Sequence, residues 1–185
     1  MMIRFAMLFG LILSVVLPVS TAQAQRKYSR SYKYLKKMEW CVGSWSGKLE
    51  LQGNVPEIIK KQGQAHLDLT IRWSNKKSAL TAQRTLRVQD RIITTDVGII
   101  GWDPDKKVIR YQLFDSRGGF GSGVWKDKDK KWILKLKLNA GSGSKFEEQY
   151  VVTGIQKDYF VIEHTNPFFP GFEFTVRGKM NRVKE

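Results

Sequence analysis

Segments in which apolar and polar residues alternate recur along most of the chain, and each is bounded by a short turn-forming stretch. The pattern is clearest in residues 99–123, where Val108 to Phe114 alternates as a strand between two turns. In the first turn Pro104 presets φ, and in the second Gly118 and Gly119 can adopt positive φ without steric cost. Two hairpins around one strand predict an antiparallel meander.

The same alternation continues on both sides of this region and predicts about ten strands, each with one apolar side. The other predicted strands cover residues 45–51, 67–73, 80–88, 92–102, 132–138, 146–153, 159–165 and 172–183, and one more follows the Gly118-Gly119 turn toward Val124 and Trp125. A flat sheet of this many strands leaves exposed edges, whereas closure into a barrel removes them. We therefore predict an all-β, antiparallel up-and-down β-barrel with a short helix before it, at residues 34–41. A two-sheet β-sandwich is the alternative.

The first residues have the pattern of a secretory signal peptide. Arg4 precedes an apolar run from Phe5 to Val16, and Ala22-Gln23-Ala24 follows as a small-x-small cleavage site. The apolar run is shorter than the roughly 20 residues that span a bilayer, so an uncleaved anchor is only the alternative. We predict a signal peptide at 1–24, a flexible basic arm at 25–31 and one barrel domain at 32–185. The predicted location is periplasmic or secreted.

Charge and cysteine content restrict the class of protein further. Cys41 is the single cysteine, which excludes an internal disulfide and suggests a small buried side chain; a catalytic thiol is the alternative. The net charge of +15 favours anionic partners such as a membrane surface or an acidic glycan. The basic residues are scattered along the sequence, so the alternative is that they only form a solvated surface and bind no partner. We expect no nucleic acid, because an exported protein rarely meets it.

Motifs for catalysis are missing from the sequence. Two histidines, one cysteine and no Gly-x-Ser-x-Gly motif leave no triad to assemble. Asp103-x-Asp105 and Asp127-x-Asp129 resemble parts of a calcium loop but lack its other oxygen ligands, so we interpret both as turns. No catalytic residue and no metal site are predicted, and an enzyme of unrecognised type remains a third hypothesis.

Polar residues on the apolar side of a strand mark the candidate binding site, because burying an unpaired charge is costly. Arg84 lies between Ala82 and Leu86, and Tyr111 and Glu148 occupy similar positions in their strands. A barrel of this size encloses side chains and at most a small ligand. We predict that the barrel binds an apolar or amphipathic molecule, with Arg84 and Tyr111 holding a carboxylate. A salt bridge between Arg84 and Glu148, or Arg84 at a strand end in water, is the alternative.

The motif Gly43-Ser44-Trp45, between a short helix and a series of strands, resembles the lipocalin and fatty-acid-binding (calycin) superfamily. The resemblance implies that Trp45 closes one end of the barrel and that an arginine of the last strand packs over it. Arg182 is the first candidate for that arginine, and Arg177 is the second. An Arg–Tyr pair holds the ligand carboxylate in fatty-acid-binding relatives, which is similar in chemistry to the predicted site.

A closer likeness covers most of the chain and rests on the motifs Leu35-Lys36-Lys37-Met38-Glu39-Trp40, Gly43-Ser44-Trp45, Ile100-Gly101-Trp102-Asp103-Pro104, Phe114-Asp115-Ser116 and Gly119-Phe120-Gly121-x-Gly123-x-Trp125. Together they resemble an uncharacterised family of exported bacterial lipocalin-like domains, which sometimes follow a SnoaL-like domain. This likeness implies a fold and leaves the activity open.

Haem-binding relatives, the nitrobindin-like barrels, take iron through a histidine on the final strand. The predicted final strand has none here, and His164 lies on the strand before it. We therefore predict no cofactor. Haem bound through His164 is the alternative, and a histidine satisfied by contacts within the protein is the plainer interpretation.

Overall fold

The computed structural model describes residues 28–53, 64–89, 91–165 and 174–184. The predicted signal peptide and the first residues of the predicted arm lie outside this part of the chain. Within it, Ser29 of the arm hydrogen-bonds to the carbonyl oxygens of Lys76 and Lys77. The elements are α1 (Tyr32–Leu35), η2 (Lys36–Cys41), β1 (Gly43–Gly53), β2 (Ala65–Trp73), η3 (Asn75–Lys77), β3 (Leu80–Val88), β4 (Arg91–Asp103), β5 (Val108–Asp115), β6 (Phe120–Lys128), β7 (Lys131–Asn139), β8 (Lys145–Thr153), β9 (Tyr159–Thr165) and β10 (Phe174–Arg182).

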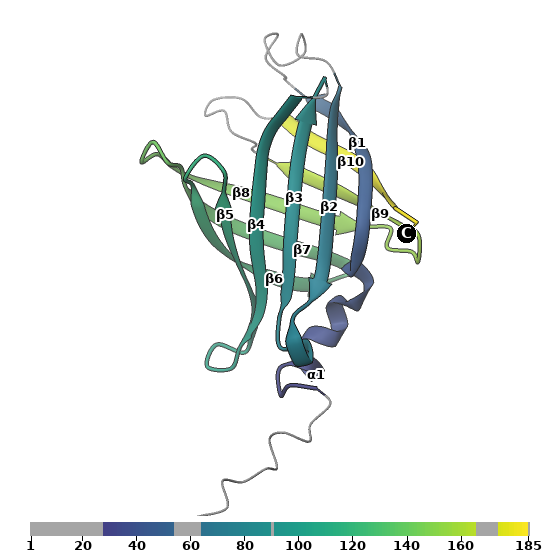
Figure 1. The fold of residues 1–185 in the computed structure, drawn as a ribbon, viewed down its shortest axis with the longest axis vertical. Coiled ribbons are helices and arrows are strands. Elements are labelled where there is room, and N and C mark those ends of the chain that lie inside the picture. Colours follow the sequence, from purple (N-terminus) through teal and green to yellow (C-terminus); the bar gives the residue numbers. More distant parts are fainter. Residues whose placement is uncertain (1–27, 54–63, 90, 166–173, 185) are drawn as a thin grey trace, which may run out of the picture.

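The ten strands form one closed barrel in which each strand pairs with its neighbours in sequence and β1 pairs with β10. Every strand pair is antiparallel (Figure 1). The predicted up-and-down barrel is thereby confirmed, and the β-sandwich is excluded. Closure leaves every strand with two hydrogen-bonded partners, which removes the exposed edges that an open sheet would have.

Alternation decides which residues face the barrel interior. In β7, for example, Leu134, Leu136 and Leu138 are buried, while Lys135 and Lys137 between them are exposed. Successive side chains of a strand point to opposite faces of the sheet. When the sheet closes, the face that carries the apolar residues therefore lines the inside of the barrel.

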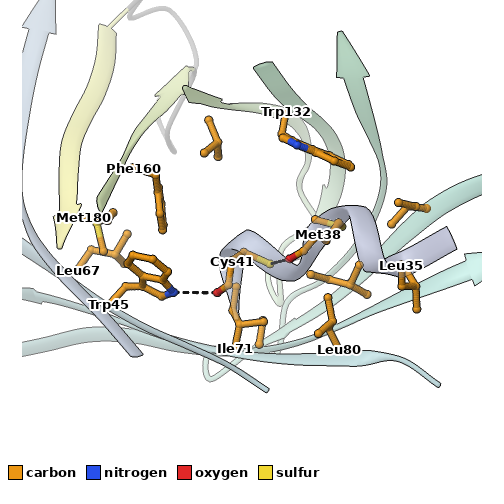
Figure 2. Packing of buried hydrophobic residues seen from close by; sticks show 14 residues of the cluster. Leu35, Met38, Cys41, Trp45, Leu67, Ile71, Leu80, Trp132, Phe160 and Met180 are labelled. Carbon is orange, nitrogen blue, oxygen red and sulfur yellow. Dashed lines mark hydrogen bonds between the residues drawn. The ribbon is translucent and has the colours of Figure 1, made fainter. Parts of the chain in front are cut away.

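One end of the barrel is closed by α1 and η2, and we call it the helix end (Figure 1). Leu35, Met38 and Cys41 have helical spacing and are buried there. Helices this short do not persist alone in water, so their stability comes from packing. The barrel supplies the surface they pack on, through Trp45, Ile71, Leu80, Trp132, Phe160 and Met180 (Figure 2). No helix within the described ranges is long and apolar enough to cross a membrane.

Candidate functional site

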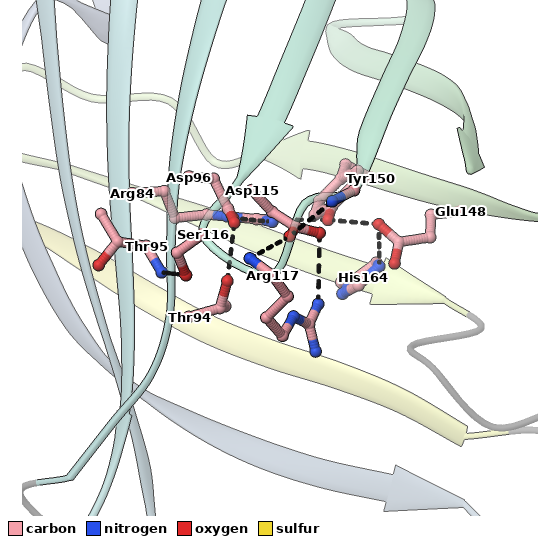
Figure 3. Close-up of polar contacts among 11 residues, drawn as sticks. Arg84, Thr94, Thr95, Asp96, Asp115, Ser116, Arg117, Glu148, Tyr150 and His164 are labelled. Atoms are coloured by element: carbon pink, nitrogen blue, oxygen red, sulfur yellow. Dashed lines mark hydrogen bonds and ion pairs between the residues drawn. The ribbon is translucent and has the colours of Figure 1, made fainter. Parts of the chain in front are cut away.

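A buried group of polar side chains lies inside the other half of the barrel, toward the β3–β4, β5–β6 and β7–β8 turns (Figure 3). We call it the polar cluster. It contains side chains from four strands: Arg84 of β3, Thr94 and Asp96 of β4, Glu148 and Tyr150 of β8, and His164 of β9. All face inward because each occupies the buried parity of its strand.

Arg84 connects the two sides of the cluster. Its Nε and Nη2 atoms contact Asp96 Oδ2 in an ion pair, and Thr94 Oγ1 donates a hydrogen bond to the other carboxylate oxygen at 2.9 Å. On the other side, Arg84 Nη1 donates to the Tyr150 hydroxyl at 2.7 Å. The guanidinium group therefore joins β3 and β4 to β8 across the barrel.

Tyr150 extends this network of contacts to Glu148 and His164. The Tyr150 hydroxyl donates to Glu148 Oε2 at 2.7 Å, and His164 Nε2 lies 3.1 Å from that same oxygen. The His164 and Tyr150 rings stack with their centroids 4.1 Å apart. Glu148 Oε1 is buried without a hydrogen-bond partner among the described residues.

The pKa shifts in the cluster follow from burial and these contacts. Burial pushes the pKa of Glu148 up, but the hydrogen bonds and charges of His164, Tyr150 and Arg84 outweigh it and lower that pKa. Burial opposes the charge of Arg84, yet Tyr150 and Asp96 raise its pKa well above the ordinary value. Burial also raises the pKa of Tyr150 well above its usual range. Glu148 is therefore ionised at neutral pH, and Arg84 keeps its charge.

A cavity of about 70 Å³ lies between the polar cluster and the helix end. Its walls are mostly apolar and come from both halves of the barrel; Arg84, Tyr111, Tyr150, Trp40 and Trp125 are the lining residues that carry side-chain nitrogen or oxygen atoms. The other lining residues are Met38, Cys41, Leu67, Leu69, Ile71, Ala82, Ile100, Leu113, Leu134, Leu136, Val152, Phe160 and Ile162. Apolar walls with a few polar groups are typical of small-molecule sites.

Two indole groups on this cavity lack hydrogen-bond partners. The Nε1 atoms of Trp40 and Trp125 are both buried, and neither has a partner among the described residues. An unpaired buried donor costs about 1–3 kcal/mol, so these N–H groups would gain from an acceptor. The lining residues thus include two with unpaired N–H donors, whereas the Tyr150 hydroxyl already donates to Glu148.

Tyr111 reaches the cavity because β4 has no side chain at Gly98. A Cβ atom at Gly98 would overlap the Tyr111 ring. Burial raises the pKa of the Tyr111 hydroxyl to about 12, so the group is protonated at neutral pH. Tyr111 is close enough to Arg84 to influence its charge, but Arg84 donates its hydrogen bonds to Asp96 and Tyr150.

The structure brings three of the candidate binding residues, Arg84, Glu148 and His164, into one cluster and places Tyr111 beside it on the cavity. Arg84 and Glu148 do not form the direct salt bridge considered from the sequence, because Tyr150 lies between them. His66, on the polar parity of β2, is outside the cluster and contacts Ser46 and Asp68. Among the described residues, no group of three or more His, Cys, Asp or Glu can hold a metal ion.

Trp45 and Arg182, the candidate barrel-end pair, lie opposite each other in the β1–β10 register. The Arg182 guanidinium is 4.1 Å from the centre of the Trp45 ring and donates to the Val42 carbonyl at 2.9 Å. Trp45 Nε1 donates to the Cys41 carbonyl at 2.8 Å. These contacts tie η2 to the first and last strands. Arg177, the second candidate, is instead exposed and pairs with Glu163.

Asp96, Thr94 and Tyr150 are members of the cluster that the sequence analysis missed. Asp96 and Thr94 share the inward parity of Gly98 and Ile100, so alternation within residues 92–102 contained the signal. That stretch has apolar residues on both faces of the strand, so alternation did not show which face points inward. Tyr150 looked like an ordinary core aromatic, and its role depends on contacts across the barrel.

Comparison with known proteins identifies the fold. No protein-family model matches the sequence, and no curated protein is significantly similar to it. Among solved structures, Rv2717c from M. tuberculosis aligns with a TM-score of 0.57 and 12% identity, over 81% of this chain and 97% of that one. The S-type phycobiliprotein lyase CPES from Guillardia theta aligns with a TM-score of 0.51 and 12% identity, over 86% and 96%. At this level of identity the likeness shows the fold alone, and the chain shares the barrel fold of these two proteins.

Proposed function

We propose that this protein is an exported carrier that binds a compact amphipathic molecule inside its barrel. The observation that carries the proposal is the cavity with mostly apolar walls, whose lining includes Arg84, Tyr111 and two tryptophans, Trp40 and Trp125, with buried indole N–H groups that lack a partner among the described residues. One structural neighbour is a phycobiliprotein lyase, and its lipocalin-like barrel is compatible with ligand binding in this fold.

The size of the cavity limits the ligand. A cavity of about 150 Å³ holds a benzene molecule in a well-studied engineered case, and the cavity here measures about 70 Å³. A small head group or a short chain fits with modest shifts of the lining. A longer ligand requires displacement of η2, whose Met38 and Trp40 form part of the wall.

The charges of the cluster favour a neutral head group. Asp96 already neutralises Arg84, and the ionised Glu148 adds a further negative charge beside His164. A ligand carboxylate would bring another negative charge to a site with no surplus cation, which is costly at low dielectric. A carbonyl or amide oxygen accepts from the same donors without that cost. The carboxylate predicted from the sequence is therefore the weaker candidate.

Calorimetric titration with matched ligands tests the proposal. Acetamide and propanamide, which are small enough for this cavity, should bind, and acetate and propionate should bind about tenfold more weakly or not at all. The variant Ala82→Leu fills the cavity wall and should abolish binding, while Trp125→Phe removes one donor and should weaken it. Native mass spectrometry of protein purified from its host then identifies the resident ligand. Unchanged binding in Ala82→Leu, or an empty protein that ignores the whole panel, would rule out the cavity as a binding site.

Export is supported by the signal-peptide pattern of residues 1–24, and it has its own test. N-terminal sequencing of the protein from a periplasmic extract or culture medium should begin at Gln25. A chain that starts at its initiator methionine and fractionates with the cytoplasm would contradict export without affecting the cavity.

A further inference from the structure

The outside of the barrel carries an apolar face that the interior site does not explain. Six of the eight large apolar side chains that are exposed in the described residues lie on three consecutive strands. They are between 44% and 63% exposed: Ile92, Ile93, Val97 and Ile99 of β4, Phe114 of β5 and Phe120 of β6. Such a concentration differs from the scattered exposed apolar residues that are normal on protein surfaces.

The strand register joins these side chains into one patch. Val97 lies opposite Phe114, and Phe114 lies opposite Phe120, so the three form a row across β4, β5 and β6. Ile99 continues the patch along β4 on the same side of the strand. At the other end of β4, the register shift near Leu86 and Arg87 leaves both Ile92 and Ile93 outside. We call this set of six residues the outer apolar face.

The outer apolar face is bordered by lysines on the adjoining strand. Lys135 and Lys137 are exposed on β7, which pairs with β6; Lys137 is opposite Ser122, and Lys135 is opposite Val124. Arg117 is exposed in the β5–β6 turn next to the two phenylalanines. Two acidic groups lie nearby, but Glu147 pairs with Lys137 and Asp115 with Arg117. The border is therefore net positive, on a chain whose formal charge is +15.

We propose that the outer apolar face docks the barrel onto an anionic lipid membrane. Isoleucine and phenylalanine side chains insert at the boundary of head groups and acyl chains, and the flanking lysines attract acidic head groups. A second copy of the chain fits the face less well, because an isologous contact would bring two strongly basic surfaces together. A closed barrel also offers no free strand edge here, so strand addition does not account for the patch.

Vesicle co-sedimentation with the mature protein tests the docking. The wild type should bind vesicles of phosphatidylcholine mixed with phosphatidylglycerol and should fail to bind phosphatidylcholine alone. Raising the salt concentration should weaken the binding, since the head-group attraction is screened. The double variant Phe114→Ser/Phe120→Ser removes apolar contacts from exposed positions and should bind about tenfold more weakly.

Lysine pairs of equal charge separate local attraction from net charge. Lys135→Gln/Lys137→Gln, at the border of the face, should lose about tenfold in vesicle affinity. Lys48→Gln/Lys184→Gln loses the same charge at exposed positions on β1 and after β10, and should bind nearly as the wild type does. Equal loss in both pairs, or full binding by the phenylalanine variant, would overturn the proposal. So would a concentration-dependent dimer that Phe114→Ser/Phe120→Ser abolishes, because a second copy would then cover the face.

Discussion

The two halves of the barrel interior are filled in opposite ways. At the helix end, apolar side chains pack around Trp45 and the short helices, and Cys41 Sγ and Trp45 Nε1 bond to nearby backbone. In the polar cluster, charged and hydroxyl groups from four strands bond to one another. Apolar burial is non-directional and tolerates approximate fits, whereas a buried charge requires its partner. The cavity lies where these two kinds of packing meet.

This contrast predicts the largest loss of stability at the helix end. Trp45→Ala removes a side chain that is 1% exposed, packs on Phe160 and anchors η2 through its indole. The free energy of unfolding should fall by about 4 kcal/mol, as for other large buried aromatics. Urea unfolding followed by far-UV circular dichroism measures the loss. Trp45→Phe keeps an aromatic ring, so its free energy of unfolding should fall much less. Equal losses in the two variants would show that aromatic packing at position 45 does not account for the stability of this end.

Removing one charge of the buried pair gives the next largest effect. Asp96→Ala leaves Arg84 buried without its carboxylate, and the free energy of unfolding should fall by about 3 kcal/mol. The double variant Arg84→Met/Asp96→Leu replaces the pair with apolar groups and should recover most of that loss, because no charge stays unpaired. The same denaturation experiment compares the three proteins. A double variant as unstable as Asp96→Ala would show that the ion pair itself stabilises the fold.

The pH dependence of stability gives a smaller expected effect in the polar cluster. The pKa of Glu148 is lower in the folded protein than its ordinary value of 4.5, so the unfolded chain binds the proton more readily. Stability from this group is complete above about pH 5 and is lost as the pH falls through the folded pKa. Glu148→Gln should therefore be less stable than the wild type at pH 7, and the gap should close in acid. Glu147 is the exposed neighbour of Glu148 on the outside of the barrel, and Glu147→Gln should show no such difference in stability from the wild type. A gap of constant size at every pH would disprove the linkage.

The smallest expected effect concerns reactivity at the helix end. Burial raises the pKa of the Cys41 thiol to about 12, and its Sγ donates to the Met38 carbonyl at 2.8 Å. The folded protein should resist thiol reagents at pH 8, because the thiolate is scarce and inaccessible. Labelling followed over time by mass spectrometry therefore reports how often η2 opens. Rapid labelling of fully folded protein would show that the helix end opens independently of the polar cluster.

Much of the fold was predictable from local sequence. Alternation in segments such as 132–138, together with turns rich in Gly, Asp and Lys, predicted the strands and their inward faces, and the number of strands favoured closure. The Gly-x-Trp motif after a short helical segment resembled the start of lipocalin-like barrels and favoured the same fold. These features depend on neighbours a few residues apart, so they are visible without coordinates.

The partners inside the barrel were decided by the tertiary structure alone. Arg84 meets Asp96 through the β3–β4 register, and it meets Tyr150 only because the sheet closes and brings β8 across from β3. The alternation in the sequence predicted that Arg84 is a buried charge, but it did not predict the partner of that charge. Contacts across a barrel depend on closure of the sheet and tilt of the strands, and not on spacing in the sequence. The outer apolar face arose in the same way: Ile99 and Ile100 look alike in the sequence, and the sheet puts one in solvent and the other in the core.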